Sequence, residues 1–262
     1  MPERDNAVND LSNWRVESLR LTVFSSAMPE VAAIKWWELV TGQPSETKTV
    51  QPRARILQEV GPIKDGLCNL SLECQQQRID WLFSPILKEK EELTEFPTFA
   101  SFPDGLKLFK EMLLPWFGQC PLATRLAFGA TLTQSVADRK AGYEILGSFL
   151  PAVKLDPENS SDFSYQINRP HLSTCGISGL HVNRLSRWSV ARLSGMLVQF
   201  SVGQQISAQT FESNRGLNAC RLELDINTVP RTEGTFDQKM LSAIVQELVD
   251  LGREIAAKGD IP

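Results

Sequence analysis

Residues 15–24 (RVESLRLTVF) and 125–129 (RLAFG) decide the fold, because they open two similar halves of this 262-residue chain. The first stretch alternates polar and apolar residues, which is the period of a half-buried strand. A helix-like run follows each stretch, containing WELV at 37–40 in one half and YEIL at 143–146 in the other. The sequence therefore predicts two units that begin in the same way.

Further matches follow in the same order. Each half has a glutamine four residues before a proline and then a tryptophan: Gln58, Pro62 and Trp81 against Gln166, Pro170 and Trp188. We predict an internal duplication of a strand–helix–strands–helix unit, at residues 14–118 and 119–262, behind a disordered lead-in at 1–13. Such units give an α+β fold of mainly antiparallel strands with helices on one face, packed as one globular body. They form either one continuous sheet or two facing sheets.

Local signals place the remaining elements. In the first half we expect a helix at 28–41 ended by Gly42, a polar loop at 43–52, strands at 55–60, 70–74 and 78–83 with a turn at Asp65-Gly66, and a helix at 105–117 capped by Asp104. In the second half we expect strands at 123–132, 163–168, 179–187, 190–202 and 219–227, and helices at 136–148 and 235–257.

This layout, with the strand of Arg125-Leu126-Ala127-Phe128-Gly129 at mid-chain and a final strand and helix, resembles a sporadically distributed family of uncharacterised bacterial proteins of about 250 residues. The resemblance covers most of the chain and rests on layout and apolar positions. It implies a duplicated α+β fold and no activity or catalytic residues.

Composition limits the class of protein. The net charge of −4 and the pI near 5.4 argue against a bulk electrostatic nucleic-acid binder. Five scattered cysteines fit a reducing cytosol better than a disulfide framework. Residues 1–13 have no apolar core of a signal peptide, and no run of about 18 apolar residues exists, so we expect a cytoplasmic protein without membrane contact.

Catalytic and metal motifs are weak. His171, Cys175 and His181 lack the spacing and the fourth ligand of a zinc site, so we predict no metal. Cys175 with His181 as base is the remaining enzymatic hypothesis, a thiol enzyme, without a local signature around it. Phosphate-binding glycine motifs are missing from the sequence. We therefore predict no catalytic residues and no cofactor.

The sharpest anomaly is that residues 163–211 contain no Asp or Glu. The same segment holds Trp188 and four arginines: Arg169, Arg184, Arg187 and Arg192. Strand alternation would place Arg184 and Trp188 on one face, as in platforms that stack bases or hold phosphates. The alternative is that carboxylates elsewhere in the chain pair with these arginines.

Two further features concern partners. Trp36 and Trp37 are adjacent on the expected helix, about 100° apart, so one of them is a candidate interface residue unless a broad face buries both. Residues 203–218 form a long polar connection suited to adaptable hydrogen bonding. The sequence thus favours a non-enzymatic interaction protein that docks a protein partner or itself. The alternative is a nucleic-acid or nucleotide-binding accessory protein that uses residues 163–211.

Overall fold

The computed structural model describes residues 10–87, 93–193, 196–199, 207–210, 216–231 and 234–260. Within them the chain is an α+β protein with one large antiparallel sheet and four α-helices, which confirms the predicted fold class. The lead-in was predicted too long, because Leu11–Asn13 form a 3-10 turn capped by Asp10; residues 1–9 lie outside the described residues. No helix of the described residues is long and apolar enough to cross a membrane.

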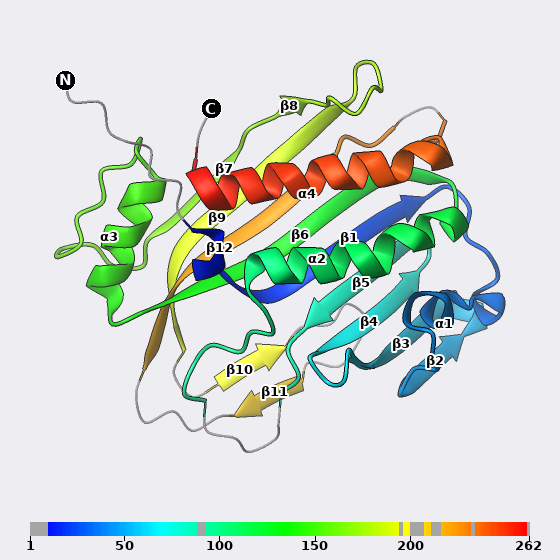
Figure 1. Ribbon diagram of the computed structural model, residues 1–262, viewed down its shortest axis with the longest axis horizontal. Coiled ribbons are helices and arrows are strands. Elements are labelled where there is room, and N and C mark those ends of the chain that lie inside the picture. The colour runs from blue at the N-terminus through cyan, green and yellow to red at the C-terminus, as the bar shows by residue number, and fades with distance from the viewer. Residues whose placement is uncertain are drawn as a thin grey trace.

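Ten strands form the sheet in the order β2-β3-β4-β5-β1-β6-β12-β9-β7, with β8 paired to β9 (Figure 1). Their bounds are β1 (Arg15–Ser25), β2 (Thr47–Gln51), β3 (Ile56–Ile63), β4 (Cys68–Gln75), β5 (Arg78–Ser84), β6 (Ala123–Val136), β7 (Ser164–Asn168), β8 (His171–Leu172), β9 (His181–Leu193) and β12 (Leu217–Thr228). Two further strands, β10 (Met196–Gln199) and β11 (Ser207–Thr210), pair with each other. The predicted connection 203–218 therefore contains a strand, while its residues 203–206 and 211–215 lie outside the described residues.

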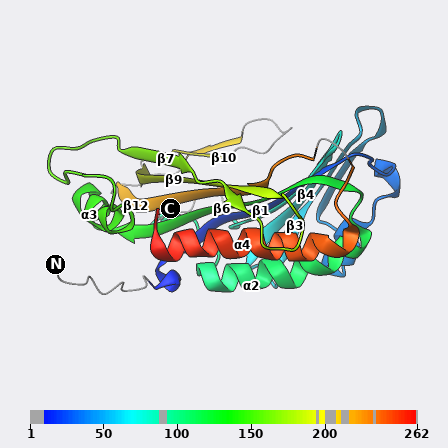
Figure 2. The ribbon, with the colours of Figure 1, turned by 90° about the horizontal axis from the view of Figure 1, so that it is seen from above.

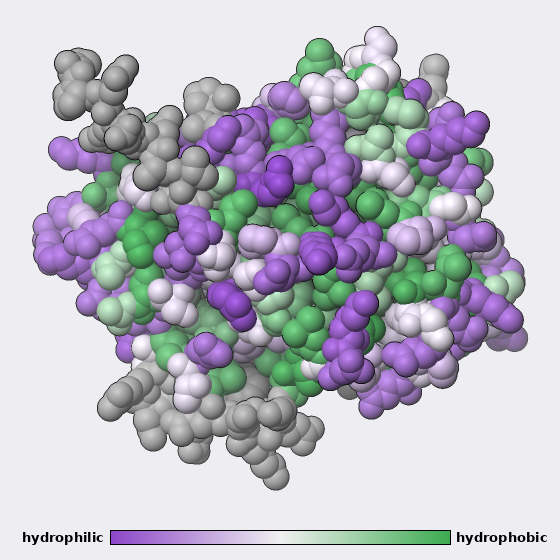
Figure 3. All heavy atoms as spheres, in the orientation of Figure 1, coloured by the Kyte–Doolittle hydropathy of each residue, from purple (hydrophilic) through white to green (hydrophobic). Residues whose placement is uncertain are grey.

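The helices lie on one face of the sheet, as predicted, and α2 and α4 run side by side across it (Figures 1 and 2). Their bounds are α1 (Trp36–Thr41), α2 (Phe102–Leu113), α3 (Arg139–Phe149) and α4 (Leu241–Lys258). Alternate strand residues such as Leu19 and Leu21 are fully buried on this face of the sheet, as are helix residues such as Ile244 and Leu248. Each such side chain contributes about 1.5–3 kcal/mol by burial. Over α2 and α4 the outer surface intersperses hydrophilic and hydrophobic side chains (Figure 3).

The sheet is continuous through both halves of the chain. β1 pairs with β6 at the centre, followed outward by β5, β4 and β3 on one side and by β12, β9 and β7 on the other. Thr22 faces Ala127, the residue to which the sequence matches it. Trp81 lies on β5, which is next to β1, whereas Trp188 lies on β9, which β12 separates from β6. The two tryptophans that the sequence matches therefore do not occupy corresponding places in the sheet. The internal duplication stays a prediction.

Several expected elements differ from the structure, and tertiary contacts explain them. The helix at 28–41 is reduced to a 3-10 turn and α1, because Ile34 is extended and the chain turns to bury Trp36 against Trp116. The sequence predicts two separate strands at 179–187 and 190–202, but residues from both form the single strand β9, because β12 pairs with it from Val182 to Leu193. The loop at 43–52 contains β2, which pairs with β3. Ser101, not Asp104, caps α2.

The end of α4 is fastened to two other elements. Gly259 has a positive φ of 80°, and the N–H of Asp260 donates to the carbonyl oxygen of Phe149 at 2.9 Å. The carboxylate of Asp260 accepts from Arg169 Nε at 2.5 Å and from Tyr165 Oη at 2.7 Å. These hydrogen bonds, chiefly the one from Arg169, lower the pKa of Asp260. The chain end thereby ties α4 to α3 and β7.

We expect Gly259→Ala to lower the free energy of unfolding by about 1–3 kcal/mol, since only glycine adopts this backbone conformation readily. A Cβ there would also lie 2.0 Å from the Phe149 carbonyl oxygen. Gly147→Ala is the matched control, because this exposed glycine of α3 has open space around it. It should leave stability unchanged or raise it by up to about 1 kcal/mol. Urea unfolding measures the stability of both variants. Equal free energies of unfolding would contradict the structural role given to Gly259.

Candidate functional site

The candidate site is the face of the sheet that lies opposite the helices, which we call the open face. One row of residues crosses five strands of it, and the pairings give its order as Leu185, Asp225, Gly129, Arg20 and Leu82. Leu185 and Leu82 are partly exposed, so the row has apolar ends and a charged centre. Because Gly129 has no side chain, the row is hollowed in the middle.

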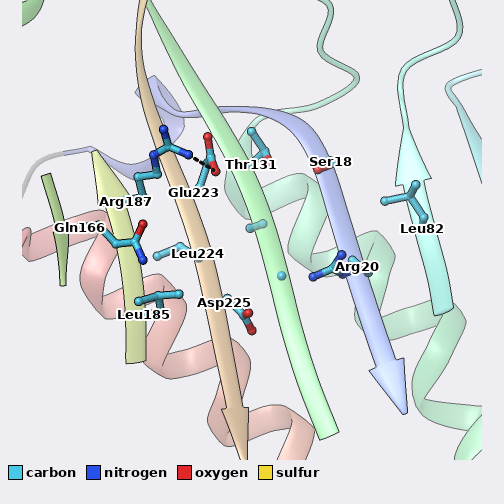
Figure 4. Close-up of a pocket in the computed structure, with 12 residues that line it drawn as sticks. Ser18, Arg20, Leu82, Thr131, Gln166, Leu185, Arg187, Glu223, Leu224 and Asp225 are labelled. Atoms are coloured by element: carbon cyan, nitrogen blue, oxygen red, sulfur yellow. Dashed lines mark ion pairs between the residues drawn. The ribbon is translucent and has the colours of Figure 1, made fainter. Parts of the chain in front are cut away.

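This hollow has a volume of about 340 Å³. Figure 4 shows Arg20 and Asp225 standing on either side of β6, with Gln166 and Thr131 farther along the same surface. A Cβ at Gly129 would lie 3.5 Å from both Nε and Nη2 of Arg20, so the guanidinium lies across the glycine. β6, which has no side chain at Gly129, therefore forms the floor of the hollow.

Arg20 makes no hydrogen bond or ion pair within the described part of the chain. Arg125, the residue matched to it on β6, donates from Nη2 to Asn227 Oδ1 at 2.9 Å, its diagonal neighbour on β12. The corresponding diagonal neighbour of Arg20 is Asp80 on β5. That carboxylate is already taken, so Arg20 keeps its five N–H donors for water or a ligand.

Asp80 is held by two other residues. Arg78 donates to it from Nε at 2.5 Å and from Nη2 at 2.9 Å, and Thr22 donates from Oγ1 at 2.5 Å. Asp80 is 8% exposed, and such charge-assisted pairs are among the stronger hydrogen bonds in proteins. Burial also raises the pKa of the neighbouring Glu73. The carboxylate of Asp80 is therefore already engaged by residues of β5 and β1.

A second ion-pair network lies at the other end of the hollow. Glu223 on β12 is 3.9 Å from Arg187 Nη1 and 3.4 Å from Arg221 Nη1, and Arg221 donates to Glu17 at 3.0 Å. Burial raises the pKa of Glu17, and the charge of Arg221 opposes that rise. Asp225 accepts a hydrogen bond from Asn227 at 3.0 Å. The charges beside Arg20 are thus largely paired with each other.

Arg184 and Trp188 do share one face of β9, as alternation predicts, but it is the helix-covered face. Trp188 is fully buried, with ring centroids 5.3 Å from Phe149 and 6.1 Å from Trp14. Arg184 is 8% exposed and lies 4.0 Å from Glu254 of α4. The prediction that this pair forms an exposed stacking platform is wrong, because α3 and α4 pack on this side of β9.

The other predicted arginines are separated. Arg169 pairs with Asp260, Arg187 with Glu223, and the exposed Arg192 lies against Gly216. Three of the four arginines in the acid-free segment therefore meet carboxylates from β12, α4 or the chain end. This is the internal pairing that the sequence left open as the alternative.

Trp36 and Trp37 are both buried, at 7% and 1% exposure, so the prediction of an exposed interface tryptophan is wrong. Trp36 packs edge-on against Trp116, with ring centroids 5.4 Å apart. Trp37 fits beside Gly61, where a Cβ would lie 3.4 Å from its ring. Both tryptophans belong to the core.

Hydrogen bonds hold the loop that contains Cys175 against α4. Ser173 Oγ and the Thr174 N–H each donate to Glu247 of α4 at 2.5 Å, and Ser173 Oγ lies 3.0 Å from Cys175 Sγ. Among the described residues no hydrogen bond joins Cys175 to His181, and no group of His, Cys, Asp and Glu could hold a metal ion. The thiol-enzyme hypothesis gains no support from this geometry.

A second hollow, of about 620 Å³, runs along α4 beside this loop. Its charged groups are engaged with each other or with the loop: Glu254 with Lys258 at 2.9 Å, Asp250 with Arg253 at 3.5 Å, and Glu247 with Thr174. It therefore offers a ligand fewer free groups than the hollow at Gly129.

Arg20, Gly129 and Asp225 were not among the site residues predicted from the sequence. Arg20 and Gly129 stand in the two matched stretches, but their meeting depends on the register between β1, β6 and β12. The only local signal was a glycine inside a strand, which often marks a close approach to the backbone.

No family model, no curated protein and no solved structure matches this chain. The resemblance to the uncharacterised bacterial family therefore stays a prediction, and the candidate site rests on geometry.

The pairing on the open face can be tested by removing one arginine at a time. Arg78→Ala should lower the free energy of unfolding by about 1–3 kcal/mol, since it leaves the buried carboxylate of Asp80 underpaired. Arg20→Ala is the matched control on the next strand and should change stability by no more than about 0.5 kcal/mol. Chemical denaturation measures both, and a larger loss for Arg20→Ala would show that Arg20 has a structural partner.

Cysteine reactivity can be tested with iodoacetamide. Burial raises the pKa of Cys68, Cys120 and Cys220 to about 12, and it also raises the pKa of Cys74. Cys175 alone is partly exposed. Mass spectrometry of the native protein should show one adduct, at Cys175, which Cys175→Ser removes, and five after unfolding in urea. Modification of a second cysteine at the same rate would mean that the core is open.

Proposed function

We propose that this chain is a non-enzymatic binding protein that docks a protein partner, or a second copy of itself, on the open face of its sheet. The observation that carries this proposal is the row from Leu185 to Leu82, in which Arg20, beside the central Gly129, has no hydrogen-bond or ion-pair partner among the described residues. Arginine is one of the residue types most enriched in interface hot spots.

The size of the open face also supports a protein partner. The nine strands from β2 to β7 span about 38 Å, from eight intervals of about 4.8 Å. The central strands β1 and β6 contain 11 and 14 residues. Such a surface is large enough for the roughly 800 Å² that each partner buries in an ordinary protein–protein interface.

A nucleic-acid-binding role is less well supported. Three arginines of the acid-free segment are paired with carboxylates, and Glu223 and Asp225 add negative charge beside the hollow. These carboxylates would repel a phosphate backbone. We also propose that the protein works in the reducing cytoplasm, a location that its five free cysteines support.

Site-specific photo-crosslinking in cells that naturally make the protein tests the docking face. A benzophenone amino acid in place of Leu185, which is partly exposed on the open face, should give a protein adduct. The same group in place of Lys107, exposed on α2, is the control and should give none. An adduct of twice the chain mass identifies a second copy, and one removed by nuclease favours the nucleic-acid alternative. Adducts at Lys107 alone would place the docking surface on the helices.

A further inference from the structure

The chemistry of the hollow indicates what it binds, on the assumption that the proposed docking role is correct. We propose that Arg20 anchors a carboxylate side chain of a protein partner, which enters the hollow above Gly129 between Arg20 and Asp225. The partner therefore presents an Asp or Glu from a polypeptide segment that lies across β1, β6 and β12.

The availability of Arg20 is the first step. Arg125 donates from Nη2 to Asn227, whereas the corresponding neighbour of Arg20, Asp80, already accepts from Arg78 and Thr22. The guanidinium of Arg20 lies on the open face across Gly129, and Arg20 is one of the residues that line the hollow. A planar guanidinium with free donors binds a carboxylate through two parallel hydrogen bonds.

The neighbouring charges select the kind of anion. Asp225 and Glu223 line the same hollow, while Arg187 and Arg221 are occupied by Glu223 and Glu17. Asp225 repels any anion bound to Arg20, and it repels a singly charged carboxylate less than a phosphate, which carries close to two negative charges at neutral pH.

The remaining lining favours a polypeptide over a small free acid. Asp225 is used by one hydrogen bond, from Asn227, and its other oxygen can accept a backbone N–H of the same segment. Leu185 and Leu82 at the ends of the row offer partly exposed apolar surface to the residues on either side. The row can therefore bind a carboxylate at Arg20, a backbone N–H at Asp225 and apolar side chains at Leu185 and Leu82. A short stretch of peptide carries all three kinds of group.

The test is an NMR titration that follows the arginine Nε–Hε signals of the whole protein. The probe is N-acetyl-glutamate amide, and the matched neutral control is N-acetyl-glutamine amide. We expect the Arg20 signal, assigned by its loss in Arg20→Lys, to saturate with a Kd at least ten-fold lower for the glutamate probe. Inorganic phosphate should bind more weakly than the glutamate probe. Equal affinities for the two amides, or tighter phosphate binding, would overturn the proposal.

Two variants and one crosslink separate this proposal from the docking role. Gly129→Val should fill the hollow and abolish the ten-fold preference, whereas Gly129→Ala, whose Cβ meets Arg20 at an ordinary 3.5 Å, should retain most of it. The Leu185 crosslink should be at least ten-fold weaker in Arg20→Ala. A crosslink that persists unchanged in Arg20→Ala overturns the anchor and leaves the docking role standing. No crosslink in the parent chain overturns the docking role itself.

Discussion

The antiparallel pairing of β1 with β6 is the contact on which the rest of the structure depends. Among the described residues, it is the one place in the large sheet where a strand of the first half pairs with a strand of the second. Its register sets Leu21 against Phe128 in the core and Arg20 against Gly129 on the open face. A slip of β6 by one residue would turn Phe128 to the open face and Gly129 toward the helices, so burial of one face fixes the register.

The packing of the helices on one face explains the unusual charge distribution. Residues 163–211 contain no carboxylate, yet their arginines are not a free positive surface, because β12 and α4 bring Glu223, Glu254 and Asp260 next to them. The segment supplies the cations and later segments supply the anions. A charge pattern that is one-sided in the sequence is thus balanced across neighbouring strands.

Local sequence patterns correctly predicted those strands, turns and helices whose sequence signals lie within their own residues. The first strand, the turn at Asp65-Gly66 with both residues at positive φ, and the final helix are confirmed. The helix at 28–41 is wrong because burial of Trp36 and Trp37 overrides helix propensity. The site itself was beyond local patterns, since Arg20, Gly129 and Asp225 are brought together only by the register of three strands.

The candidate site does not lie where the sequence pointed. The sequence directed attention to the acid-free segment 163–211 in the second half. In the structure the unpaired guanidinium belongs to the first half, and the floor and the opposing carboxylate belong to the second. Arg125, which the sequence matches to Arg20, donates to the amide oxygen of Asn227. The corresponding neighbour of Arg20 is Asp80, whose carboxylate accepts from Arg78 instead. Neither half alone could present this hollow, so a binding role would arise from the pairing of the two halves.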